Sequence, residues 1–216
     1  MSNSNFDFNE LVRESKEVLI NPKSYFSTMR TSGGFVEPLI KAVIYGAVAG
    51  IIVFLWGIFG IGSVAGGVLG GAIGVMALIW YIIAAIFGLF IGAVILLVIS
   101  SICKGSTDFE TCTRVTAAIM VLMPVSALLS FTMGINTYFG IFINLAVNVF
   151  ALWLIFNGLV ESLKAKQETA RIVMYILIAL LVLFTLIGLG TKNRVNRYLD
   201  GYNKEFKELM REAEKD

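Results

Sequence analysis

Four polar residues form two pairs in a mostly apolar stretch of the chain, and the members of each pair are one helical turn apart. Asn144 and Asn148 are four residues apart, and so are Asn157 and Glu161. Residues with this spacing lie on one face of a helix. Amide and carboxylate groups in that arrangement could line a polar path for a small solute or ion. They could equally be structural, because amides in lipid commonly bond to neighbouring helices.

Side chains for proton transfer or nucleophilic catalysis are not arranged in any recognisable set. The chain has no histidine, and no zinc-binding spacing, nucleotide loop or catalytic triad can be assembled from its sequence. Cys103 and Cys112 flank one short polar loop that we expect to be reduced, so we predict two free thiols. The sequence therefore predicts a protein that is not an enzyme and has no metal site and no cofactor.

A glycine repeat forms the most unusual segment of the sequence. Glycine recurs every four residues at Gly62, Gly66, Gly70 and Gly74. On a helix, this spacing makes a flat ridge that another backbone can approach closely. Packing within the chain, an oligomer interface and a water-lined pathway are all open interpretations. Gly46 and Gly50 repeat the spacing, which favours general close packing over one special site.

Charge placement predicts the elements that must carry these residues. The chain is 57% hydrophobic and only 15% charged, with a mean hydropathy of +0.84. Residues 42–103, 115–160 and 172–191 contain no Asp, Glu, Lys or Arg. A bilayer core about 30 Å thick needs roughly 20 apolar residues per helical crossing. The three runs predict two, two and one crossings, so we expect an all-α integral membrane protein, a bundle of five transmembrane helices.

Local signals divide the chain into an arm, a membrane domain and a tail. We predict a cytoplasmic amphipathic arm over 1–35, the five-helix domain over 36–190 and an amphipathic C-terminal helix over 191–216. The predicted membrane helices are 38–59, 75–102, 108–133, 138–163 and 168–189. Thr107 and Glu110 have the spacing of a capping box at the start of the third helix, and Pro124 is expected to bend it.

The arm is predicted to contain two short helices. Asp7 and Glu10 have capping-box spacing, and one helical face collects Phe8, Leu11, Val12 and Leu19. Asn21 and Pro22 end this helix and start a second one, because proline suits the first helical position. The arm lies on the membrane surface in one interpretation and docks a soluble partner in the other.

Positive charges predict the orientation of the helices. The arm with Lys41 holds five Lys or Arg residues, and the connections 104–114 and 161–171 hold two and three. These segments should face the cytoplasm. The tail then lies on the opposite side although it carries seven positive residues. Lys41 follows Glu37 by one turn, which predicts an ion pair and a lysine that extends to the surface. The net charge of +2 gives no indication of a nucleic-acid partner.

Three short motifs in this order resemble the Yip family of Rab-GTPase-interacting membrane proteins. They are NPKSYFSTM at 21–29, EPL at 37–39 and KGSTDFETCTRV at 104–115, followed by Pro124 where the family tends to have a proline. The resemblance implies five membrane helices, a cytoplasmic N-terminus and a C-terminus on the opposite side. It further implies a trafficking-type scaffold without enzymatic chemistry.

We interpret the chain as a prokaryotic member in the cell membrane, with the lipid bilayer and other membrane proteins or further copies of itself as partners. It lacks the long N-terminal region and the tyrosine- and proline-rich signature of eukaryotic members, so Rab binding is not carried over. The candidate partner-binding residues are Tyr25, Phe26, Met29, Asp108, Phe109 and Glu110. The alternative is a small permease or channel that uses Asn144, Asn148, Asn157 and Glu161.

Overall fold

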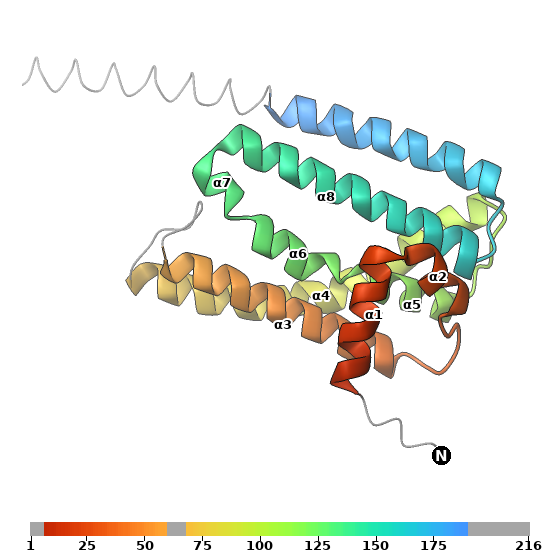
Figure 1. Ribbon diagram of the computed structural model, residues 1–216, viewed down its shortest axis with the longest axis horizontal. Helices are drawn as coiled ribbons and strands as arrows, with labels where there is room; N and C mark the ends of the chain where they lie inside the picture. The colour runs from red at the N-terminus through yellow and green to blue at the C-terminus, as the bar shows by residue number, and fades with distance from the viewer. Residues whose placement is uncertain (1–6, 60–67, 190–216) are drawn as a thin grey trace, which may run out of the picture. The chain divides into compact units, whose positions relative to one another are not determined.

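The regular structure of the described part of the chain is entirely helical. A computed structural model describes residues 7–59 and 68–189, without the side chains of residues 68–74 and 77. Its labelled elements are α1 (Phe8–Ile20), α2 (Pro22–Thr28), α3 (Val36–Ile58), α4 (Val68–Ile102), α5 (Phe109–Ile119), α6 (Leu122–Leu129), α7 (Thr132–Ile135), α8 (Thr137–Asn157) and a π-helical turn, η1 (Gly158–Ser162), and a further helix covers Gln167–Leu189 (Figure 1). The chain divides into two units, residues 1–176 and 177–216.

Five helical stretches are long and apolar enough to cross a membrane. They are Val36–Ile58, Leu78–Ile102, Phe109–Ile135, Thr137–Ser162 and Gln167–Leu189. The prediction of an all-α protein with five membrane-spanning helices is therefore confirmed, with most ends within three residues of those expected. The described part of the second unit, residues 177–189, completes the last of these helices.

Some predictions fall where the structure gives little or no description. The tail 191–216 lies outside the described residues, and so do Gly62 and Gly66. Gly70 and Gly74 lie within α4, so the later half of the glycine repeat is helical. Its role as a packing or oligomer interface remains a prediction.

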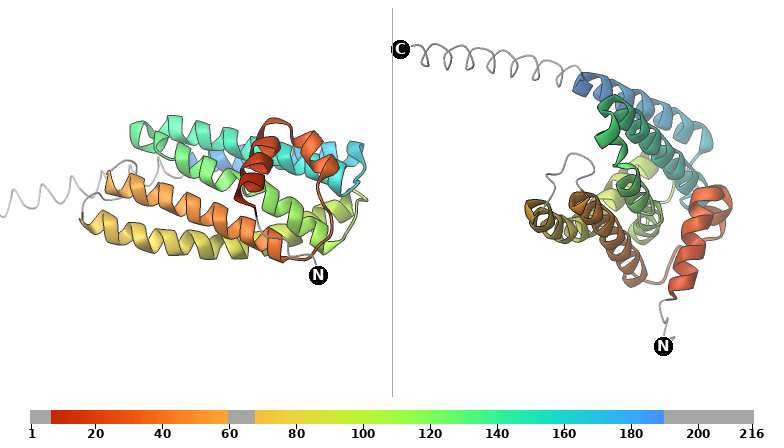
Figure 2. Two further views of the ribbon diagram at one scale, coloured as in Figure 1. Left: turned by 60° about the horizontal axis from the view of Figure 1, so that its bottom comes forward. Right: turned by 60° about the vertical axis from the view of Figure 1, so that its left-hand side comes forward.

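α3 and α4 lie side by side along their length (Figures 1 and 2). Their contact depends on Gly46 and Gly50, two of the glycines that repeat the four-residue spacing. A Cβ atom on Gly46 would lie 2.7 Å from the Cβ atom of Ala85 and 2.9 Å from the carbonyl oxygen of Tyr81. A Cβ atom on Gly50 would lie 2.9 Å from the Cα atom of Leu78. The two backbones thus approach as closely as small residues permit.

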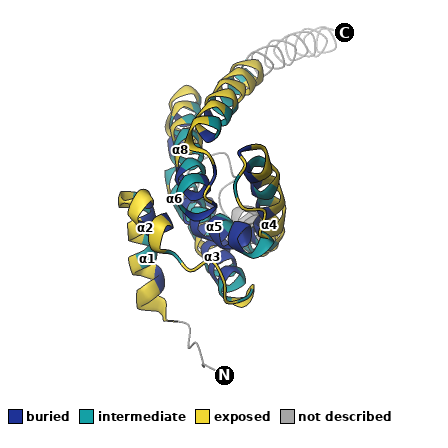
Figure 3. Cartoon of the chain, turned by 90° about the vertical axis from the view of Figure 1, so that its right-hand side faces the viewer, coloured by how far each residue is buried: buried dark blue, intermediate teal, exposed yellow. Residues whose placement is uncertain are grey.

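α5 is the central helix of the first unit and contacts α1, α3, α4, α8 and η1. Most of its residues are buried (Figure 3). Its buried side chains are small or polar over most of its length, Thr111, Cys112, Thr113, Val115, Ala117 and Ala118, with Arg114 among them. Small side chains let several helices approach one central helix at once.

The third membrane-spanning stretch is interrupted just before Pro124. Proline has no N–H group, and its ring clashes with the carbonyl four residues earlier, which is that of Met120. α5 ends at Ile119, and α6 begins at Leu122. The Met120 carbonyl accepts a hydrogen bond from the Met123 N–H at 2.9 Å instead. The Met120 carbonyl, which proline leaves without its usual helical donor, is therefore paired within the same stretch of chain and does not need a neighbouring helix.

The predicted charged connections of the first unit meet at one end of the helices. The Ser106 N–H donates to the Leu163 carbonyl at 2.7 Å, and the Lys166 N–H donates to the Cys103 carbonyl at 2.9 Å. These bonds join the connection after α4 to the connection after η1. The arrangement agrees with the charge count, which expects these segments on one side of the membrane.

Replacing Gly46 with alanine should destabilise the α3–α4 pair, because the new methyl group meets backbone that cannot move aside. Overpacking of this kind costs about 1–3 kcal/mol. We expect a lower melting temperature for Gly46→Ala in detergent. Gly88→Ala is the matched control, since nothing lies within 4 Å of a Cβ atom there. Equal melting temperatures for the two variants would contradict the close approach.

Candidate functional site: a polar layer at one end of the helices

We use the name polar layer for α1, α2, the connections 29–35, 103–108 and 163–166, and the charged residues of α3 and α5 that meet them, Glu37, Lys41, Glu110 and Arg114. Local sequence signals start its two helices. The Asp7 side chain caps α1 by accepting a hydrogen bond from the Asn9 N–H at 2.8 Å. Asn21 stands at the N-cap of α2, with Pro22 at the first helical position. Both predicted helix starts of the arm are confirmed.

The face that α1 packs against the protein overlaps only in part with the one predicted. Leu11 and Val18 are buried, whereas Phe8 and Val12 are 61% and 53% exposed. The Ser15 and Tyr45 hydroxyl groups lie 2.7 Å apart and link α1 to α3. Leu11 of the predicted face is therefore buried against the protein, whereas Phe8 and Val12 stay exposed, because the buried face also carries polar side chains that pair with α3.

α2 holds the arm against η1 and α8. Phe26 is 1% exposed and contacts Gly158, whose Cβ position would also meet Val115. The Ser162 hydroxyl group donates a hydrogen bond to the Phe26 carbonyl at 2.7 Å. Tyr25 packs edge-to-face on Phe26 with 5.3 Å between ring centroids. Tyr25 and Phe26 therefore face inward, Met29 is half-buried, and the outer surface of the arm belongs to other residues.

A chain of alternating charges joins α1, α3 and α5. The Lys41 Nζ atom lies 2.8 Å from Glu37 Oε1, which confirms the predicted ion pair, and 2.6 Å from Glu14 Oε2 on α1. The Lys41 side chain is only 10% exposed, so the expected extension to the surface is wrong. The arm covers this lysine and supplies a second carboxylate for it.

Arg114 continues this chain of charges from α5. Its Nη1 atom lies 2.8 Å from Glu37 Oε2, and its Nε atom lies 3.2 Å from Glu110 Oε1. Its Nη2 atom donates to the Gly34 carbonyl at 3.0 Å, and the Gly34 N–H donates to Glu110 at 2.6 Å. Gly34 adopts a φ of 87°, which L-residues with side chains rarely adopt. The linker between arm and bundle is thus fixed to α5.

The start of α5 differs from the predicted capping box. The N-cap residue is Asp108 rather than Thr107, and its carboxylate accepts a hydrogen bond from the Thr111 N–H at 2.8 Å. Hydrogen bonds from Thr111 hold the pKa of the Asp108 carboxyl below its ordinary value. Glu110 bonds to Gly34 and Arg114 instead of capping, and Phe109 packs on Phe35 at 5.9 Å between centroids.

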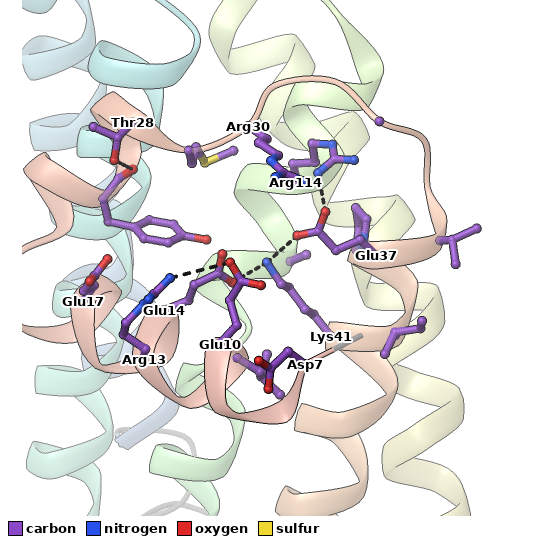
Figure 4. A pocket seen from close by; sticks show the side chains of 18 of the residues that line it. Asp7, Glu10, Arg13, Glu14, Glu17, Thr28, Arg30, Glu37, Lys41 and Arg114 are labelled. Atoms are coloured by element: carbon purple, nitrogen blue, oxygen red, sulfur yellow. Dashed lines mark hydrogen bonds and ion pairs between the residues drawn. The ribbon is translucent and has the colours of Figure 1, made fainter. Parts of the chain in front are cut away.

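A polar cavity of about 390 Å³ lies between the arm and the bundle (Figure 4). One wall carries α1 carboxylates, among them Glu10, Glu14 and Glu17. Arg30, just after α2, and Arg114 on α5 also line it. The cavity therefore presents both signs of charge next to the membrane-spanning part of α3.

Cys103 and Cys112 are free and buried, as predicted. Burial raises the pKa of the Cys103 thiol, so this thiol stays protonated at neutral pH. Within residues 7–59 and 68–189, no group of three or more His, Cys, Asp or Glu side chains is placed to hold a metal ion.

The polar residues of α8 do not form one continuous row. The Asn148 side chain donates to the Asn144 carbonyl and side-chain oxygens at 2.8 and 2.9 Å, so the bonds stay within α8. Asn144 and Asn148 line a second cavity of about 420 Å³ beside the break at Pro124. Asn157 is buried and bonds to the Trp153 carbonyl at 2.8 Å. Half-buried Glu161 lies 4.0 Å from Lys23 of the arm.

A comparison with known proteins identifies the family of the chain. Residues 16–189 match the family model of the Yip1 domain, which is well over half of the chain. The chain belongs to the Yip1 domain family. The Yip1 domain here begins within α1 and ends with the last membrane-spanning helix, so it includes most of the polar layer. No curated protein and no solved structure matches the chain.

Two residues of the polar layer were missed by sequence reasoning. No partner was predicted for Glu14. Leu11, Glu14 and Val18 share one helical face, however, so this face could have been predicted to be buried. Arg114 was counted only as a positive charge that sets orientation. Its position in a membrane-spanning stretch was the available signal, because a charge there needs a partner.

Removing Arg114 should destabilise the Yip1 domain strongly, because Glu37 and Glu110 would lose their shared partner. Breaking a buried ion pair typically costs about 3–5 kcal/mol. We expect Arg114→Ala to melt well below the unmodified protein in detergent. Arg13→Ala is the matched control, since the Arg13 side chain is 67% exposed in its pair with Glu10. A melting temperature for Arg114→Ala as high as that of the control would contradict the network.

Proposed function

We propose that this Yip1-domain protein is a non-enzymatic membrane scaffold that works by contact through its polar layer. The supporting observation is that the arm is held on the bundle by buried charges while its outer face stays exposed. Lys41 and Arg114 bind the inner side, whereas Val12 and Ile20 are 53% and 70% exposed. An ordered, partly apolar outer face suits a partner that approaches along the membrane surface.

A small permease is the second candidate, and the cavity at Asn144 and Asn148 favours it. Ser126 and Ser130 add hydroxyl groups to the same cavity. Charged side chains within membrane spans usually mark transport pathways. Lys41 and Arg114, however, pair with carboxylates in the polar layer and do not line this cavity. Transport therefore has less support than contact.

We propose that the polar layer faces the cytoplasm of a cell and that the C-terminus lies on the other side of the cell membrane. Support comes from the positive residues gathered in the arm and the two joined connections. Reporter fusions at residues 1, 108, 165 and 216 test this topology. We expect cytoplasmic signals from the first three and none from the last. A cytoplasmic signal at residue 216 would contradict an odd number of crossings.

Site-specific photo-crosslinking in native membranes tests the scaffold function. We expect a crosslinker at Val12 or Ile20 to capture a defined protein partner, because both side chains are exposed on the arm. Val18 is the matched control on the same helix, since it is 1% exposed. Only intramolecular products from all three positions would contradict contact through the arm.

Flux through proteoliposomes tests the permease alternative. In our proposal the unmodified protein transports neither ions nor small polar solutes, and Asn144→Leu with Asn148→Leu changes nothing. Reproducible flux that is lost in this double variant would favour the permease. The melting temperature of the double variant serves as the folding control.

A further inference from the structure

We infer that the cavity beneath the arm binds the headgroup of an aminophospholipid, which carries a primary ammonium group and a phosphodiester. The ammonium would lie against the α1 carboxylates and the phosphodiester against Arg30 and Tyr25. This inference concerns a ligand and does not depend on the proposed scaffold function.

The cavity lies at the level where charge ends along two membrane-spanning helices. Lys41 is the last charged residue before the run 42–103, and Arg114 is the last before the run 115–160. Both residues line the cavity. The apolar parts of α3 and α5 continue from this level into the bilayer core. Lipid headgroups occupy the same level, so a lipid can reach the cavity without leaving the membrane.

The α1 wall offers carboxylates that the protein itself does not fully use. Glu14 binds Lys41, but the Glu17 carboxylate has no ion pair or side-chain hydrogen bond among the described residues. Glu10 has only a 3.6 Å contact with the exposed Arg13. Figure 4 shows these carboxylates on one wall of the cavity. A primary ammonium group can donate three hydrogen bonds to such acceptors.

Two donors face the cavity without a partner in the described part of the chain. The Arg30 guanidinium group has no ion pair there. Tyr25 is only 8% exposed, yet its hydroxyl group makes no hydrogen bond to a described residue. That oxygen is not fully covered, and Tyr25 lines the cavity. Burial also raises the pKa of Tyr25, so its hydroxyl stays a neutral donor.

The charges lining the cavity match a zwitterion better than an ion of one sign. Five acidic residues and four basic residues line it, and several of them already pair with each other. Asp7 has no ion pair but caps α1, and the two lining charges that have no partner among the described residues, Glu17 and Arg30, have opposite charge. An anionic headgroup would leave Glu17 unpaired, and a simple amine would leave Arg30 unpaired. A headgroup with both charges satisfies both residues.

An apolar side of the cavity gives the acyl chains an exit. Val36 and Ile40 lie one turn apart on α3 and line the cavity. Val36 is 70% exposed, so this side is open. Acyl chains that pass these residues would continue along α3 into the bilayer. A soluble compound with the same headgroup chemistry would gain nothing from this apolar side.

Native mass spectrometry of the full chain in detergent tests the inference. The probes are dioleoylphosphatidylethanolamine, dioleoylphosphatidylcholine and dioleoylphosphatidylglycerol, which share their acyl chains. We expect the ethanolamine lipid to be retained about tenfold better than either of the others, since the choline lipid has no N–H group to donate to the carboxylates and the glycerol lipid has no ammonium group. Equal retention of the three lipids, or preference for the glycerol lipid, would overturn the proposal.

Variants locate the binding in this cavity. We expect Glu17→Gln and Arg30→Gln each to lower retention of the ethanolamine lipid about tenfold, without a change in melting temperature. Tyr25→Phe keeps the ring and should lower retention as well. Lys16→Gln is the matched control, because Lys16 is an exposed charge on α1 that does not line the cavity. Unchanged retention in both charge variants would overturn the proposal.

A competition experiment separates the lipid from a soluble ligand. Glycerophosphoethanolamine carries the same headgroup without acyl chains. We expect it not to displace the lipid at equal concentration, because it cannot use the apolar side formed by Val36 and Ile40. Full displacement at equal concentration would assign the cavity to a soluble phosphoamine and overturn the assignment to a lipid.

Discussion

A charged side chain inside a membrane-spanning helix must find opposite charge nearby, because the bilayer core offers no water to solvate it. The fold of this chain depends on how that demand is met for Lys41 and Arg114. Glu37 lies between them and binds both, at 2.8 Å each. Glu14 and Glu110 then complete the chain of charges from α1 and α5. Three elements that are distant in sequence are thereby held at one end of the bundle.

The position of the arm follows from this pairing. Glu14 gives Lys41 a second carboxylate besides Glu37, and this ion pair holds α1 against α3. Phe26 and Ser162 then fix α2 on η1 and α8. This placement encloses the polar cavity, which combines paired charges with a few unpaired ones. A layer that is fixed on its inner side and exposed on its outer side is suited to contact with partners and with lipid headgroups.

The other contacts of the bundle depend on residue size and backbone geometry and not on charge. α3 and α4 approach closely because Gly46 and Gly50 lack side chains, and the break before Pro124 follows from the missing N–H group of proline. These features could be predicted because spacing and residue type act locally. The Lys41–Glu37 pair could be predicted for the same reason, since residues four apart on a helix are neighbours. The N-cap of α5 could not, because Thr107 and Asp108 both suit that position.

The sequence by itself determined the five membrane-spanning helices, the two short helices of the arm and the gathering of charge at one end. Hydropathy and helical spacing are properties of consecutive residues, so they can be read along the chain. Only the tertiary structure decided that Tyr25 and Phe26 face inward, that Glu14 binds Lys41, and that Arg114 joins the linker to α5. These outcomes depend on which elements meet in space, and the residues that meet lie tens of positions apart in the sequence. Burial of a charge makes such meetings specific, because only a matched partner offsets its desolvation.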